Sequence, residues 1–155
     1  TALACVLTIV PKVPIGGGYV HFGDCIIYVA AMILGPIPGA IVGAIGHSLA
    51  DFISGYPIFC IPTFIIKGIE GLVAGMIAHK YSVNKNFVNV YTILASVVAM
   101  VIMVVGYFLG GSVLEGVSAS IGSVPSNAMQ AVASLIIFFV LGFALYKAKI
   151  YKYFD

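Results

Sequence analysis

The chain has 155 residues, of which 62% are hydrophobic and only 8% are charged, and its mean hydropathy is +1.18. Soluble domains carry about 25% charged residues, so this composition excludes an ordinary soluble domain and indicates an integral membrane protein. The net charge of +2, built from seven lysines without arginine, gives no basic face for nucleic acid.

Turn residues divide the chain into six expected helices. The first, residues 1–10, is about half a bilayer long, so we interpret it as the second half of a truncated span. A Pro/Gly-rich loop follows at residues 11–18. The other expected helices are residues 23–34, 40–53, 58–79, 87–109 and 128–147. The fold class is therefore an all-α membrane protein with six transmembrane helices.

The segment between the last two expected helices, residues 110–126, is rich in glycine and serine and carries Glu115. We expect it to be a long loop, and long loops without secondary structure are usually functional or disordered. Glu115 itself is either part of a site or a solvated loop residue.

The lysines predict the orientation in the membrane. Two groups share one side, because an even number of expected crossings separates them: Lys80 and Lys85, and Lys147, Lys149 and Lys152. The positive-inside rule makes this side the cytoplasm, so the C-terminus is expected there. The loops at 11–22, 54–57 and 110–126 then face outward.

Ionisable residues at bilayer depth are the strongest functional signal. Such a charge costs roughly 2.5–3.5 kcal/mol on insertion scales, so it is expected to face protein, to have a partner and to have a use. In this topology the polar residues converge in the outer half of the bundle. We expect them to line a site for a small polar ligand: Asp51, Lys67, Glu70, Asn127 and Gln130.

Structural roles remain open for the same residues. Lys67 has two possible partners for a purely structural ion pair, Glu70 one turn away and Asp51 on the neighbouring helix. Asp24 is placed to cap its own helix, where a carboxylate is favoured. His47 is more often a satisfied interior histidine than a ligand.

Helix packing explains other groups. Asn127 and Gln130 can link helices by hydrogen bonds, and the glycines of GxxxG type at residues 39–43 and 71–75 let helices approach closely. The three cysteines, Cys5, Cys25 and Cys60, are scattered in apolar segments and are expected to act as small hydrophobic residues.

Motifs of catalysis are absent from the sequence. It contains no GxxxxGK[ST], no GxSxG and no HExxH. We therefore expect no enzyme activity, no catalytic residues, no cofactor and no metal site.

An ordered series of motifs runs from residue 18 to residue 72: GYVHFGD at 18–24, LGP at 34–36, GAIGHSLAD at 43–51, SGYP at 54–57 and KGIEGL at 67–72. This series resembles the substrate-binding S components of energy-coupling factor (ECF) vitamin transporters. It is most similar to the branch that takes up hydroxymethylpyrimidine or pyridoxine-type vitamin B6. Residues 87–155 match the family in hydropathy and topology only.

The resemblance implies a single integral membrane domain over residues 1–155, in the plasma membrane of a bacterial cell, that binds its vitamin from outside. It also implies a membrane coupling (T) subunit and two cytoplasmic ATPase subunits as partners. The family contacts the coupling subunit through an Ala-xxx-Ala motif on the first helix. Ala2 and Ala4 are two residues apart, and we expect the docking motif to belong to the half of this truncated span that the sequence does not include.

A vitamin of this kind is a small nitrogen heterocycle, which needs a flat aromatic surface and a few well-placed polar groups. We expect Tyr56 and Phe64 to supply the surface and Tyr19 to close from the loop above. Lys67 would donate to the ring. Two other readings remain open: a stand-alone proton-coupled carrier, and an assembly subunit that binds no ligand.

Overall fold

The computed structural model describes residues 1–11, 13–15, 18–84 and 87–150. The elements are α1 (Ala2–Ile9), strands β1 (Val13–Ile15) and β2 (Gly18–Val20), α2 (Asp24–Val29), α3 (Pro36–Ile53), α4 (Cys60–Asn84), α5 (Val90–Leu114) and α6 (Val117–Lys147). A π-helical turn, Ala30–Leu34, continues α2, and a 3₁₀ turn, Pro57–Phe59, precedes α4. The two strands form an antiparallel hairpin in which Val13 is opposite Val20.

Within the described residues, four helical segments are long and apolar enough to cross a membrane: Pro36–Ile53, Pro57–Ser82, Val90–Leu114 and Val117–Lys147. The expected all-α membrane class is thus confirmed, with one short hairpin added. The count of six spans is not established, because α1 has eight residues and the apolar helix Asp24–Leu34 is also short. A bilayer needs about 20 helical residues.

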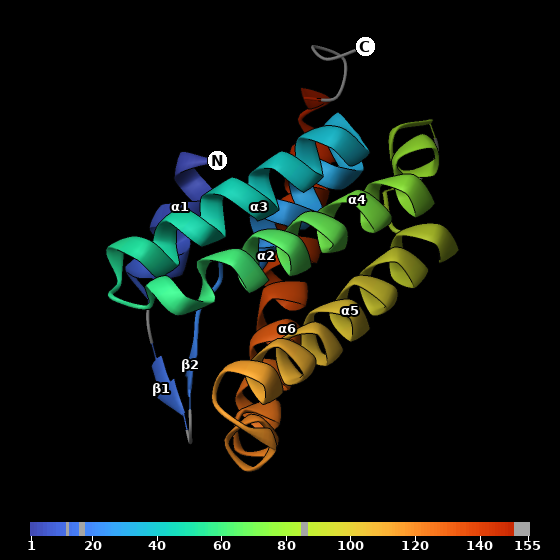
Figure 1. Cartoon of the computed structure of the whole chain (residues 1–155). Coiled ribbons are helices and arrows are strands. Elements are labelled where there is room, and N and C mark those ends of the chain that lie inside the picture. The colour runs from blue at the N-terminus through green and yellow to red at the C-terminus, as the bar shows by residue number, and fades with distance from the viewer. Residues whose placement is uncertain (12, 16–17, 85–86, 151–155) are drawn as a thin grey trace.

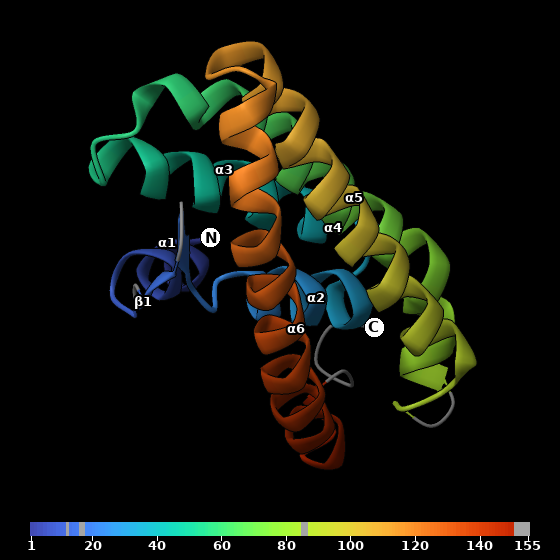
Figure 2. The same cartoon turned by 90° about the horizontal axis from the view of Figure 1, so that it is seen from below.

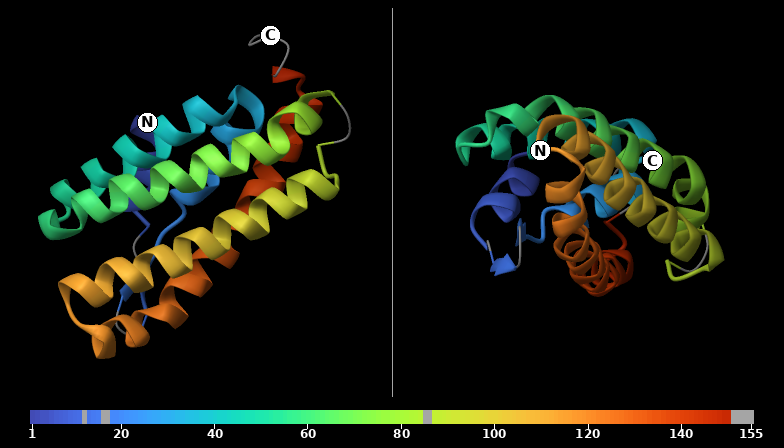
Figure 3. Two further views of the ribbon diagram at one scale, coloured as in Figure 1. Left: turned by 45° about the vertical axis from the view of Figure 1, so that its right-hand side comes forward. Right: turned by 60° about the horizontal axis from the view of Figure 1, so that its bottom comes forward.

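The helices follow one another in space much as they do in sequence. α3 packs along α4, α4 along α5 and α5 along α6, while α1 lies against α3 (Figures 1 and 2). The short α2 contacts α3, α4 and α6, so it lies inside the arc that the longer helices form (Figure 3). This central position brings the start of α2 within reach of three membrane helices.

Glycines permit the close contact between α3 and α4. A Cβ added at Gly39 would lie 2.9 Å from the carbonyl oxygen of Gly71, and a Cβ at Gly43 would overlap the carbonyl group of Lys67. The small-residue pattern in the sequence therefore serves internal packing. It also brings the backbone that carries Lys67 directly against α3.

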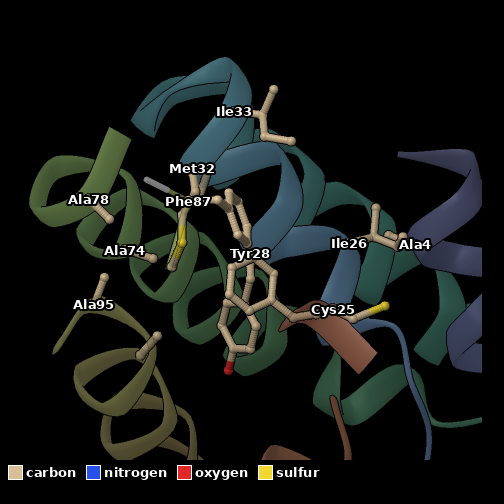
Figure 4. Close-up of a cluster of buried hydrophobic side chains, with 13 residues drawn as sticks. Ala4, Cys25, Ile26, Tyr28, Met32, Ile33, Ala74, Ala78, Phe87 and Ala95 are labelled. Carbon is tan, nitrogen blue, oxygen red and sulfur yellow. The ribbon is translucent and has the colours of Figure 1, made fainter. Parts of the chain in front are cut away.

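An aromatic cluster holds α2 in place. Tyr28 of α2 packs edge-on against Phe138 of α6 with ring centroids 5.6 Å apart, and Phe87 lies 5.4 Å from the same ring. Figure 4 shows Tyr28 beside Met32 and Phe87, with its hydroxyl oxygen at the edge of the cluster. The apolar part of Tyr28 is thus packed, and its hydroxyl is free to bond to the polar groups described below.

The prediction of a long loop at residues 110–126 is wrong. α5 continues to Leu114 and α6 begins at Val117, so only Glu115 and Gly116 separate the helices, with Gly116 at φ 93°. Serine hydroxyls in this region bond to carbonyl oxygens of the preceding turn, as in Ser112 to Phe108 at 2.6 Å. Such bonds satisfy the serine hydroxyl within an apolar helix. The serine content of this segment was therefore not a sign of a loop. Glu115 is exposed at the junction.

Two further helix boundaries differ from the expectation. α3 starts at Pro36, because proline is well suited to the first turn of a helix. α4 runs to Asn84, past the expected end at residue 79, so Lys80 is helical. Lys85 and Lys152, which support the predicted orientation, lie outside the described residues.

Candidate functional site

Asp24, the first residue of α2, is the centre of a buried polar cluster. Its Oδ1 accepts a hydrogen bond from Nζ of Lys67 at 2.6 Å, and its Oδ2 accepts one from Nε2 of Gln130 at 2.9 Å. Nε2 of His47 lies 3.1 Å from Oδ1. The helix has no side-chain cap, and Asp24 is fully buried, so the predicted capping role at the surface is wrong. One carboxylate thus joins α2, α3, α4 and α6.

Lys67 forms a second ion pair within α4. Its Nζ lies 3.0 Å from Oε2 of Glu70, whose Oε1 accepts a hydrogen bond from the hydroxyl of Tyr28 at 2.8 Å. Lys67, Glu70 and Asp24 all have 0% exposure. The desolvation of such charges can exceed their mutual attraction, so a cluster like this is weak evidence for stability. Buried ionisable residues of this kind in membrane segments mark a candidate functional site.

Two histidines flank Asp24. His21 follows β2, and its Nδ1 accepts a hydrogen bond from the amide of Gly23 at 3.2 Å. Its ring centroid lies 5.6 Å from that of His47. His47 is 1% exposed, and neither of its ring nitrogens has a hydrogen-bond partner among the described residues. Its Nε2 contacts Oδ1 of Asp24 instead, so this interior histidine has a carboxylate partner at 3.1 Å.

A second polar chain runs from Asp51 toward Lys67. The hydroxyl of Thr63 donates to Oδ2 of Asp51 at 2.5 Å and lies 3.0 Å from the hydroxyl of Tyr107. Because Thr63 has one proton, Tyr107 is the donor in the second contact. Nζ of Lys67 lies 5.6 Å from the centre of the Tyr107 ring. The salt bridges of Lys67 go to Asp24 and Glu70, and Asp51 reaches Lys67 through this chain.

The structure thus gathers three of the predicted site residues, Lys67, Glu70 and Gln130, around Asp24 and links Asp51 to them. The others lie elsewhere or are only partly described. Tyr56 is 46% exposed beside the 3₁₀ turn, and Phe64 is 51% exposed. Phe64 lines an apolar groove between α3 and α4. Asn127 is half-buried on α6, and the side chain of Tyr19 lies outside the described residues.

Sequence reasoning left several members of the cluster out of the expected site. Asp24 and His21 stand in the GYVHFGD motif and His47 in the GAIGHSLAD motif, so the motifs contained the signal. The sequence does not mark Tyr28, Thr63 and Tyr107 as members of a site, because single hydroxyl-bearing residues are common within apolar helices.

Together these groups place an ammonium, carboxylates, a carboxamide and imidazoles in one cluster that is buried from solvent. Such a set suits a small ring with both donors and acceptors.

Comparison with known proteins identifies the family. A family model described as the S component of ECF-type riboflavin transporters matches residues 1–147. The chain belongs to this family. An S component is a transport subunit, so the family confirms both the resemblance read from residues 18–72 and the expectation that the chain is not an enzyme.

Two relatives of this S component extend over most of its length. An uncharacterized protein of Pyrococcus woesei, described as lying in the gap 3′ region, is 35% identical over 144 residues, which are 92% of this chain and 93% of the relative. The thiamine precursor transporter HmpT of Lactococcus lactis subsp. cremoris (strain MG1363) is 28% identical over 144 residues, 91% of this chain and 80% of HmpT. HmpT supports the hydroxymethylpyrimidine-type branch.

Proposed function

We propose that this S component is the substrate-binding subunit of an ATP-driven ECF importer and takes up a hydroxymethylpyrimidine or vitamin B6-type heterocycle from outside the cell. The observation that carries the proposal is the buried cluster of Asp24, Lys67, Glu70 and Gln130, which three membrane-embedded elements bring to one point. The printed function of the relative HmpT supports the choice of vitamin.

Each polar group has a role that its chemistry suits. Lys67 donates to a ring nitrogen or hydroxyl of the ligand, and Glu70 accepts from an exocyclic amine or hydroxymethyl group. Gln130 binds the opposite edge, because a carboxamide both donates and accepts. Asp51 orders the Tyr107 side of the site through Thr63.

Four predicted residues complete the proposal. Tyr56 and Phe64 supply aromatic surface when the protein closes on its ligand, Tyr19 covers the site from the hairpin, and Asn127 contacts the ligand one turn before Gln130. For Phe64 this requires a change of position, since its side chain lies half exposed on the groove between α3 and α4.

The proposal includes the remaining features of the family. Residues 1–155 form one substrate-binding domain with six crossings and a cytoplasmic C-terminus in the plasma membrane. The partners are a coupling (T) membrane subunit and two ATPase subunits, which supply the energy for release of the vitamin inward.

A thermal-shift panel on the purified protein in detergent tests the ligand. The panel contains hydroxymethylpyrimidine, thiamine, pyridoxine, pyridoxal and riboflavin, each at micromolar concentration. A ligand at 100 times its Kd stabilises the folded state by about 2.7 kcal/mol, which gives a clear shift in Tm. Hydroxymethylpyrimidine or pyridoxine should give the largest shift. A shift with riboflavin alone contradicts the proposed substrate, and silence across the panel favours an assembly subunit.

Matched lysine variants locate the site. Lys67→Met that is still folded by circular dichroism should show no ligand-dependent shift, while Lys147→Met, at the exposed end of α6, should leave it unchanged. If both variants keep the shift, the cluster is not the binding site.

Transport in proteoliposomes tests the partners. Uptake that requires the coupling subunit, the ATPases and ATP supports the ECF assembly. Uptake by this chain alone that stops with an uncoupler supports the proton-coupled carrier instead.

A further inference from the structure

Three buried side chains around the start of α2 have the donor set of a metal site. His21, Asp24 and His47 each offer one ligand atom, and these atoms all lie within 4.8 Å of one another. The residues are 5%, 0% and 1% exposed, and they come from the β2–α2 connection, α2 and α3. Side chains from separate elements therefore converge on one point that excludes solvent.

The distance between His47 and Asp24 is close to that between two ligands of one metal ion. Nε2 of His47 lies 3.1 Å from Oδ1 of Asp24, in an ion-pair contact that does not have the geometry of a hydrogen bond. Two atoms bound at about 2.0–2.1 Å to one tetrahedral zinc ion lie about 3.3 Å apart. The remaining distances in the group are at most 4.8 Å, so metal binding would require the ligand atoms to move closer together.

His47 is the second, independent sign of a ligand. A buried imidazole without a hydrogen-bond partner is costly, because its desolvation is not compensated. Among the described residues neither nitrogen of His47 makes a hydrogen bond, and Nε2 faces Oδ1 of Asp24, which belongs to the same donor set. A metal ion on one of them would supply the missing interaction.

The local charge also accommodates a cation. Asp24 and Glu70 bring two carboxylates to the cluster, and Lys67 brings one ammonium, which has Glu70 as a second partner. A metal on Oδ1 of Asp24 therefore leaves Lys67 paired. On Nδ1 of His21 it would replace the bond from the Gly23 amide, at 3.2 Å. One neutral hydrogen bond is small beside a metal–ligand bond.

We propose that His21, Asp24 and His47 bind a divalent transition-metal ion, with zinc the best match to two imidazoles and one carboxylate. Three protein ligands leave the fourth position for water or another donor atom. The sequence alone led us to expect no metal. This inference does not depend on the proposed function, because it concerns the protein without vitamin.

Zinc titration of the purified protein, carrying a tag without histidine, tests the proposal. Isothermal calorimetry and the metal content after dialysis should show about one zinc per chain. Cobalt(II) bound in place of zinc should give the intense visible absorption of tetrahedral coordination. The variants His21→Gln and His47→Gln should each weaken zinc binding at least a hundredfold.

The third histidine of the chain is the matched control. His79, whose Nδ1 lies 3.2 Å from the carbonyl oxygen of Met32, is not in the group, so His79→Gln should bind zinc as the parent does. Cys25→Ser removes the thiol next to Asp24 and should also bind normally.

Absence of stoichiometric zinc in the parent, or equal zinc binding by the parent and both ligand variants, overturns the proposal. Should His47→Gln fail to fold, as judged by helical circular dichroism, His21→Gln decides alone. If zinc binds as expected but no vitamin does, the metal site stands and the proposed function fails.

Discussion

Nζ of Lys67 lies 2.6 Å from Oδ1 of Asp24, although 43 positions of the chain separate the two residues. This ion pair joins α4 to the start of α2 in a place where both side chains are fully buried. Replacing a whole buried ion pair by apolar residues is often neutral for stability, whereas removing one partner is strongly destabilising. The packing of α2 against α4 therefore depends on both charges of this pair being present.

The first prediction concerns this dependence. Lys67→Met leaves Asp24 and Glu70 without their ammonium, so the free energy of unfolding should fall by about 3–5 kcal/mol. Asp24→Asn should also destabilise the protein, because it leaves Lys67 with one carboxylate. Unfolding in mixed detergent and denaturant, followed by circular dichroism, measures both effects.

The double variant is the control for this pair. Lys67→Met combined with Asp24→Asn should lose less stability than the sum of the single losses, since the second substitution removes a charge that the first has left unpaired. Strictly additive losses would mean that the two residues do not interact in the folded protein.

The second prediction concerns the link between α6 and α2. Gln130→Leu removes the donor to Oδ2 of Asp24 and leaves a buried carboxylate oxygen with one hydrogen bond fewer. Stability should fall by about 1–3 kcal/mol. Met129→Leu, at a half-exposed neighbouring position, is the matched control and should change stability by less than about 0.5 kcal/mol. Equal Tm values for both variants would contradict the assigned contact.

The sequence was most informative where a charge interrupts an apolar helix. Lys67 and Glu70 are one turn apart in such a helix, so their burial and their mutual contact could be predicted from spacing and hydropathy. The helices themselves could be predicted for the same reason, since long apolar segments between turn residues have few alternatives in a membrane.

Contacts between distant segments could not be predicted in this way. At the start of a helix, a carboxylate can bond to its own backbone or point into the protein, and both have the same local sequence. Asp24 points inward because Gln130, 106 positions away, and Lys67 lie beside it. The helical course of residues 110–126 was missed because serine and glycine favour turns in water but are tolerated in membrane helices.

The third prediction concerns the close contact of α3 and α4. The added methyl group of Gly43→Ala would overlap the backbone carbonyl of Lys67, which cannot turn away as a side chain can. Such overpacking should cost about 1–3 kcal/mol and should also weaken vitamin binding, because Lys67 moves with its backbone. The methyl group of Gly122→Ala on α6 meets no atom of the described residues within 4 Å. It should leave binding unchanged and raise stability by about 0.5–1 kcal/mol. Identical Tm changes in the two variants would disprove the close contact.

The fourth prediction concerns the chain of hydroxyl groups that leads to Asp51. Thr63→Val removes a buried donor at 2.5 Å from the carboxylate and should lower stability by about 1–3 kcal/mol. Tyr107→Phe keeps the ring near Lys67 but removes the donor to Thr63, so it should cost less, about 0.5–1.5 kcal/mol. Tyr91→Phe, in a partly exposed tyrosine stacked on Tyr81, is the control and should be neutral. A larger loss in Tyr107→Phe than in Thr63→Val would reverse the assigned order, because it would make Tyr107, and not Thr63, the main support of the buried carboxylate.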